Sequence, residues 1–117
     1  MGRLTTHILD TARGCPAAEV KITLFAVTGD GQTEITSVTT DEDGRCDGPV
    51  LDGAEFAVGT YELQFHVGDY MRANGADLES PAFLDIVSIR FGIASAGEHY
   101  HVPLLISPYG YSTYRGS

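Results

Sequence analysis

The chain has 117 residues, 16 acidic and 7 basic side chains, and a formal net charge of −9. Hydrophobic residues make up 43% and charged residues 20%, which is typical of a globular protein and excludes disorder and fibrous repeats. We expect one domain over residues 1–117, because a chain of this length builds one core. The acidic balance excludes nucleic acid and anionic membrane surfaces as partners, and the apolar runs fall far short of the about 20 residues that cross a bilayer.

The cysteine content points to a reducing compartment. Cys15 and Cys46 form no CxxC pair, and the favoured interpretation is two reduced thiols. No charged and then apolar leader precedes Leu4. We therefore expect a cytoplasmic location.

Alternation of apolar and polar residues predicts strands along most of the chain. In chain order, we expect strands at 4–10, 19–28, 33–40, 60–67, 83–91, 98–106 and 109–114. A short helix is expected at 69–76, with Asp69 as its N-cap and Gly75 at its end. Turn-forming pairs such as Asp43-Gly44 separate the strands. This pattern predicts an all-β fold, an antiparallel sandwich of about seven or eight strands with one short helix.

The acidic run from Asp41 to Gly44 has the composition of a calcium loop but not its spacing. The closing Glu of an EF-hand is missing, so a solvated turn is the better interpretation. Signatures of common hydrolases and nucleotide-binding proteins, such as GxSxG, HExxH and the P-loop, are absent from the sequence.

The histidines offer the first candidates for chemistry. His99 and His101 share the face of their strand opposite Tyr100 and Val102, so they do not fill the core. Such a pair fits a metal site, a proton-transfer pair or a chance polar face. His66 lies on the polar face of its own strand and is interpreted as a surface residue. From local sequence alone, His7 fits an ordinary strand position as well as a functional one.

Arg45 and the C-terminal tail are the remaining candidates. Arg45 follows a turn in an acidic neighbourhood, where it either balances surface charge or binds an anion. Three tyrosines, Tyr109, Tyr111 and Tyr114, lie in the last nine residues. Chain ends are usually polar and frayed, so these rings predict a terminus docked against protein.

Several segments together resemble one family from end to end. They are Thr6-His7-Ile8-Leu9-Asp10, Gly14-Cys15-Pro16-Ala17, Gly44-Arg45, the run 99–108 and the ending Tyr114-Arg115-Gly116-Ser117. These segments resemble the 5-hydroxyisourate hydrolases, the transthyretin-related enzymes of urate breakdown. Hormone-carrying transthyretins share the sandwich but lack the terminal tetrapeptide and the residues that match His7, Arg45 and His101.

The resemblance implies a transthyretin-like β-sandwich of about eight strands, assembled as a homotetramer (a dimer of dimers) with active sites in the interface channel. It also implies the reaction. Water attacks a carbonyl of 5-hydroxyisourate, the six-membered ring opens, and 2-oxo-4-hydroxy-4-carboxy-5-ureidoimidazoline forms without a cofactor or metal.

The candidate residues suit this task, because amide hydrolysis needs a base for water and a donor for the oxyanion. His7 and His101 can divide these roles with Arg45 as the third catalytic residue, and the sequence does not decide which histidine is the base. His7, Arg45, Tyr114 and Ser117 are the expected substrate-binding residues. Two alternatives are a zinc-dependent hydrolase using His7, His99 and His101, and a non-catalytic carrier of an aromatic ligand.

Overall fold

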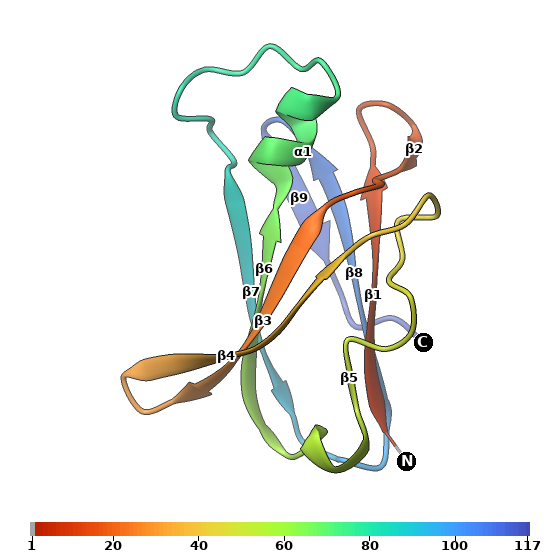
Figure 1. Cartoon of the computed structure of the whole chain (residues 1–117), viewed down its shortest axis with the longest axis vertical. Helices are drawn as coiled ribbons and strands as arrows, with labels where there is room; N and C mark the ends of the chain where they lie inside the picture. Colours follow the sequence, from red (N-terminus) through yellow and green to blue (C-terminus); the bar gives the residue numbers. More distant parts are fainter. Residues whose placement is uncertain (1) are drawn as a thin grey trace.

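Strands dominate the computed structural model, which describes residues 2–117 (Figure 1). In chain order they are β1 (Arg3–Asp10), β2 (Cys15–Pro16), β3 (Lys21–Thr28), β4 (Gly31–Thr39), β5 (Leu51–Asp52), β6 (Gly59–His66), β7 (Ile86–Ile93), β8 (His99–Ser107) and β9 (Gly110–Thr113). A short 3-10 helix, η1 (Gly53–Glu55), and the helix α1 (Val67–Ala73) complete the elements. Each predicted strand is present within a few residues of its expected bounds.

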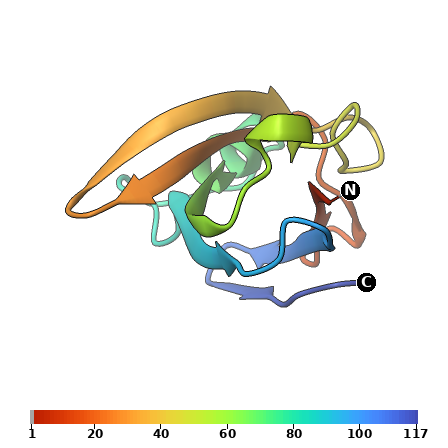
Figure 2. The same ribbon diagram turned by 90° about the horizontal axis from the view of Figure 1, so that it is seen from below.

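The strands form two sheets that pack face to face, as Figure 2 shows from below. One sheet has the order β2-β1-β8-β9, with β5 also paired to β1, and the other has the order β4-β3-β6-β7. The all-β sandwich with one short helix is thereby confirmed.

One strand pair differs from the predicted antiparallel pattern. β1 and β8 run parallel, in a register that joins Leu4 to Tyr100 and Ile8 to Leu104. A parallel pair needs a long connection between its strands, and here most of the chain separates them. The other strand pairs within residues 2–117 are antiparallel.

Alternating side chains of both sheets fill the core. Leu4 and Ile8 of β1, Leu63 of β6 and Leu104 of β8 are fully buried between the layers. Because strand side chains point to opposite faces in turn, the residues between them in sequence lie on the outer faces. The outer face of the β1–β8 pair therefore carries Thr5 and His7 of β1 and His99 and His101 of β8, whereas Thr6 and Asp10 are buried.

The helix begins two residues earlier than the sequence predicts. Asp69 lies within its first turn and is not the N-cap; His66 holds that position directly after β6 and makes no capping hydrogen bond through its side chain. Gly75 follows the helix end, as predicted. Cys15 and Cys46 are both free, also as predicted. Within residues 2–117, no helix is long and apolar enough to cross a membrane.

Candidate active site

The parallel pairing of β1 and β8 brings the N-terminal polar residues next to the histidine pair. Its register places Thr5 beside His101, Arg3 beside His99, and His7 beside Pro103. Period-two alternation turns Thr5, His7, His99 and His101 away from the core. The site is therefore built on the outer face of two central strands, where the backbone is held by hydrogen bonds on both sides.

Arg45 reaches this face through the acidic turn. One carboxylate oxygen of Asp41, Oδ1, accepts hydrogen bonds from the backbone N–H of Asp43 (2.9 Å) and of Arg45 (3.2 Å), which folds the loop back on itself. Arg45 then forms an isolated antiparallel bridge with His7. The solvated turn predicted from the sequence is confirmed, and its structural effect is to fix Arg45 against β1.

Gly44 allows the loop to approach β1 closely. Its φ of +72° lies in the left-handed region, and its carbonyl accepts the Ile8 N–H at 2.9 Å. A Cβ at this position would overlap the carbonyl oxygen of Ile8. Glycine at position 44 therefore permits the close contact with β1, and this contact holds Arg45 against His7.

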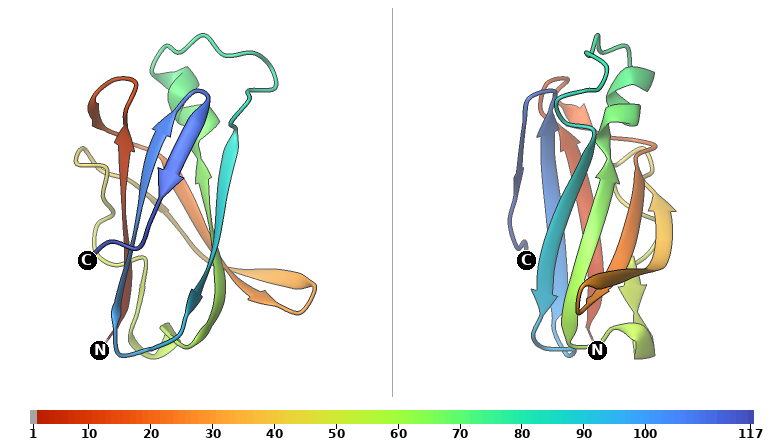
Figure 3. Two further views of the ribbon diagram at one scale, coloured as in Figure 1. Left: turned by 180° about the vertical axis from the view of Figure 1, so that it is seen from behind. Right: turned by 90° about the vertical axis from the view of Figure 1, so that its left-hand side faces the viewer.

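The C-terminal tail runs along the outer side of the same sheet (Figure 3). The Gly116 N–H donates to the His101 carbonyl at 2.8 Å, and a Cβ on Gly116 would lie only 2.7 Å from His101 Cδ2. Arg115 lies with its guanidinium 3.9 Å from the centre of the Tyr100 ring and donates to Glu98 (3.3 Å) and to the His99 carbonyl (3.2 Å). These contacts fix the backbone of the tail next to His101, one residue before Ser117.

The docked terminus is thus confirmed, but within one chain the tyrosines stay exposed, although the ring of Tyr109 lies 5.8 Å from that of Phe83. Tyr109, Tyr111 and Tyr114 are 67%, 47% and 61% exposed. The guanidinium of Arg115 and the backbone of Gly116 make the contacts instead. Three exposed rings on one short segment leave apolar surface that the single chain does not cover.

Thr5 is a site residue that the sequence did not reveal. Its Oγ1 lies 2.7 Å from His99 Nε2 and 2.8 Å from His101 Nδ1. Threonine is common in strands, so its presence at 5 carries no functional signal. Only the register of a strand that lies about 90 residues away shows that it stands between two imidazoles.

The electrostatic environment keeps His101 neutral. Partial burial lowers its pKa first, and the positive charge of Arg45 and then His99 and His7 lower it further. Each of these neighbours disfavours an added proton on the ring. His101 therefore stands as a neutral imidazole near pH 7, able to accept a proton or to donate a hydrogen bond.

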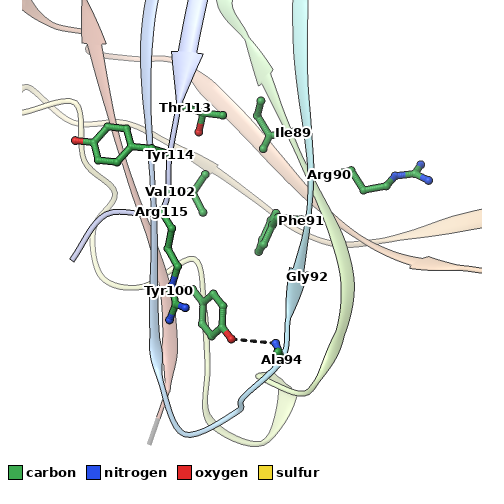
Figure 4. A pocket seen from close by; sticks show the side chains of 10 residues that line it. All are labelled: Ile89, Arg90, Phe91, Gly92, Ala94, Tyr100, Val102, Thr113, Tyr114 and Arg115. Atoms are coloured by element: carbon green, nitrogen blue, oxygen red, sulfur yellow. Dashed lines mark hydrogen bonds between the residues drawn. The ribbon is translucent and has the colours of Figure 1, made fainter.

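Two hollows adjoin these residues. A cavity of about 270 Å³ lies on the Arg45 side of the site, lined by Arg3, Thr5, Thr6, Arg45, Cys46, Gly48 and Pro49. A larger one of about 400 Å³ opens between β7 and the β8–β9 edge, where Ile89, Phe91 and Val102 supply apolar walls (Figure 4). Tyr114 lines this second hollow, whereas His7, Arg45 and His101 do not. Thr5 and Arg45 line the smaller hollow, so we place the candidate chemistry next to it, although His7 and His101 line neither of the two hollows.

The structure thus joins His7 to Arg45 and His101 to Gly116 of the tail, and Tyr114 lines the larger hollow. Within residues 2–117, no three His, Cys, Asp or Glu side chains gather closely enough to hold a metal ion. The zinc alternative, which needs His7, His99 and His101 together, is not favoured.

Fold and site define a transthyretin-like β-sandwich with a histidine–arginine cluster suited to hydrolysis. Residues 4–116 match the model of the HIUase/Transthyretin family, and the chain belongs to this family. It is 63% identical to 5-hydroxyisourate hydrolase 2 of Rhizobium meliloti over 116 residues, which cover 99% of this chain and 97% of that protein.

Solved structures agree with this assignment. The 5-hydroxyisourate hydrolase of Klebsiella pneumoniae superposes with a TM-score of 0.81 at 32% identity, over 100% of both chains. Sea bream transthyretin in complex with thyroxine superposes with a TM-score of 0.87 at 28% identity, over 97% of this chain and 94% of that one. The fold is thus shared by a hydrolase and a transthyretin in complex with thyroxine, and the residues on it must distinguish them.

Proposed function

We propose that this protein is an enzyme of urate degradation that hydrolyses 5-hydroxyisourate to 2-oxo-4-hydroxy-4-carboxy-5-ureidoimidazoline. The single observation that carries this is the 63% identity to a 5-hydroxyisourate hydrolase over nearly the whole of both chains. The geometry supports it, because His7, Arg45 and His101 gather on one face of the sheet. A carrier of aromatic ligands would not need that cluster.

The reaction needs a water molecule activated next to a ring carbonyl. A neutral imidazole accepts a proton from the water, the resulting hydroxide adds to the carbonyl carbon, and the ring C–N bond breaks as the nitrogen takes up a proton. His7 and His101 divide the roles of base and donor. Each positioned group of this kind contributes about 10²–10⁴ in rate.

Arg45 binds and orients the substrate in this account. Arg45 is exposed, its backbone is bridged to His7, and its guanidinium offers a planar fork of N–H donors to the ring oxygens. The overall charge of −9 repels anionic substrates and intermediates, so a fixed local cation matters more here than in a basic protein. Ser117, at the end of the docked tail, completes the pocket.

Assembly into a homotetramer explains the features that one chain leaves open. The edge strands β7 and β9 lie on one side of the sandwich, next to the apolar hollow and to exposed Tyr111 and Tyr114. A second copy seated there covers this surface, and Tyr114 then reaches substrate from the channel between subunits. Residues 1–117 act as one hydrolase domain in this arrangement, without a nucleic acid or membrane partner. The expected cytoplasmic location rests on the two free cysteines.

Freshly generated 5-hydroxyisourate, mixed with protein at a small fraction of its concentration, tests the function. The enzyme is expected to consume many equivalents per chain, with no loss of rate in a chelator. A carrier would bind about one equivalent and leave spontaneous decay unchanged. Loss of activity in chelator, restored by zinc, would favour the metal-dependent alternative. Light scattering on the same sample measures the assembly.

A further inference from the structure

The hydroxyl of Thr5 lies between two imidazoles at hydrogen-bond distance from both. His99, on its outer side, is exposed, whereas His101, on its inner side, is half-buried. A hydroxyl has one proton to donate and accepts through its lone pairs. Thr5 can therefore donate to at most one of the rings. When it donates to one ring, the other ring must donate to it, and the tautomers of His99 and His101 are then coupled.

We propose that Thr5 is a positioning residue that connects His101 to solvent through His99, so that His101 exchanges protons with the substrate while staying neutral. The proposal deepens the hydrolytic function proposed above and rests on it. It assigns a role to Thr5 and to His99, which the family resemblance left outside the mechanism.

The proton balance closes over a turnover. In the first arrangement His101 Nδ1–H donates to Thr5 Oγ1, and the hydroxyl donates to His99 Nε2. When His101 Nε2 accepts a proton, the Nδ1 proton passes to Oγ1, the hydroxyl proton passes to His99 Nε2, and His99 Nδ1 releases a proton to water. When His101 Nε2–H later gives its proton to the ring nitrogen, the same shifts run in reverse and a proton enters at His99. No charge accumulates on any of these residues.

The surroundings of His101 make such a relay useful. Burial lowers the pKa of His101 most, and Arg45 from the loop, His99 from β8 and His7 from β1 also disfavour an imidazolium at this position. At the tail, the positive Arg115 is paired with Glu98. A base that must become a cation here would be weak, whereas one that passes its second proton outward avoids the repulsion.

The geometry also fixes which ring atom faces the substrate. Nδ1 of His101 is engaged by Thr5, and Gly116 lies against the Cδ2 edge of the ring. Among the ring atoms able to transfer a proton, this leaves Nε2 for the reaction. Loss of the Thr5 hydroxyl would have two effects. The His101 ring would be free to turn, and the proton path through Thr5 to His99 would be lost.

A pair of substitutions at 5 tests the proposal. Thr5→Val keeps the shape but removes the hydroxyl, and is expected to lower kcat about tenfold or more with little change in KM, below the full effect of losing a direct acid–base group. Thr5→Ser should recover most of that loss. Thr11→Val is the matched control, because Thr11 also donates a hydroxyl hydrogen bond to β8, to the Ile106 carbonyl, far from the site.

Two further measurements distinguish proton transfer through Thr5 from a purely structural role of its side chain. His99→Asn should cost about as much as Thr5→Val, and the double variant should cost little more than either, because both break one path. If Thr5→Val fails to fold, His99→Asn alone still tests the proposal. Ring ¹⁵N NMR should show the tautomers of His99 and His101 changing together in the wild type and independently in Thr5→Val.

Unchanged kcat in Thr5→Val, no recovery in Thr5→Ser, or additive losses in the double variant would overturn the proposal. If the wild type did not open the ring at all, the proposed function would fail instead. The NMR coupling, which needs no substrate, would still decide whether Thr5 links the two histidines.

Discussion

The two faces of the β1–β8 pair show how one sequence pattern serves stability and chemistry separately. On β8, Tyr100 and Leu104 point inward and are buried, whereas His99 and His101 point outward. Residues adjacent in sequence thus lie on opposite faces of the sheet, and the two faces have different structural requirements. The inner face needs close packing, and the outer face needs fixed distances between polar groups.

The site is rigid because it is built on strands that the core holds in place. The strands that carry Thr5 and His101 are central in their sheet and are held from below by fully buried side chains. The loop and the tail then bring Arg45 and Gly116 from the periphery, through backbone bridges to His7 and His101. Changes on the inner face should alter stability, and changes on the outer face should alter turnover.

Removing a core side chain should give the largest effect on stability. Leu104→Ala empties a fully buried position and is expected to lower the free energy of unfolding by about 2–5 kcal/mol. The adjacent Leu105→Ala, on the half-buried outer face, should cost the folded chain less and weaken assembly instead. Denaturant unfolding and light scattering on both variants measure this, and equal unfolding energies would break the contrast between the faces.

Deleting Tyr114–Ser117 should affect turnover far more than folding. The truncation removes the contacts of Arg115 and Gly116 but no side chain of the buried core, so far-UV circular dichroism should be retained. We expect a loss of about a hundredfold in kcat, since misplacement of catalytic groups has effects of this size. A truncated protein with unaltered activity would remove the tail from the site.

Arg45→Lys should lower kcat/KM about tenfold although the charge is kept. An ammonium cannot offer two parallel N–H donors in the plane of the substrate, and a single charge-assisted hydrogen bond is worth roughly 1.5–3 kcal/mol. Steady-state kinetics of the ring opening measures the effect. An unchanged value would show Arg45 to be one more exposed arginine balancing the acidic loop.

Gly116→Ala should lower kcat by a few-fold, which is a smaller effect than that expected of Arg45→Lys. The added Cβ would lie 2.7 Å from Cδ2 of His101, closer than side-chain atoms approach, so the tail or the imidazole ring must shift. Gly97→Ala is the matched control, because a Cβ there meets no atom closer than 4.0 Å. Equal turnover in the two variants would show that the tail position does not matter to His101.

The sequence predicted the strands well because each sheet buries one face. Alternation over 60–67 and 98–106 reflects that burial directly, and the turn residues mark where it stops. It could not predict the pairing of β1 with β8, because register between distant strands leaves no local pattern. The helix start was misplaced for a related reason, since the chain continues from β6 into α1 without a capping side chain.

The same limit applies to the site. His7, Arg45 and His101 were found through the family resemblance, and their proximity is visible only in three dimensions. Thr5 was missed because a strand threonine is ordinary until its neighbours are known. The tail was predicted to dock through tyrosines packed between subunits, and this stays a prediction. Within the chain Arg115 and Gly116 dock the tail, and the sequence did not predict these contacts, because a backbone N–H and a cation over a ring leave no aromatic signal.

The kcat of His101→Asn in the ring-opening assay, measured together with the unfolding temperature of the same sample, tests the account most directly. Asparagine keeps a polar side chain of moderate size but cannot act as a base near pH 7. We expect kcat to fall at least about a hundredfold, with the unfolding temperature and the assembly unchanged. Turnover near that of the wild type would contradict a mechanism built on the outer face of β1 and β8.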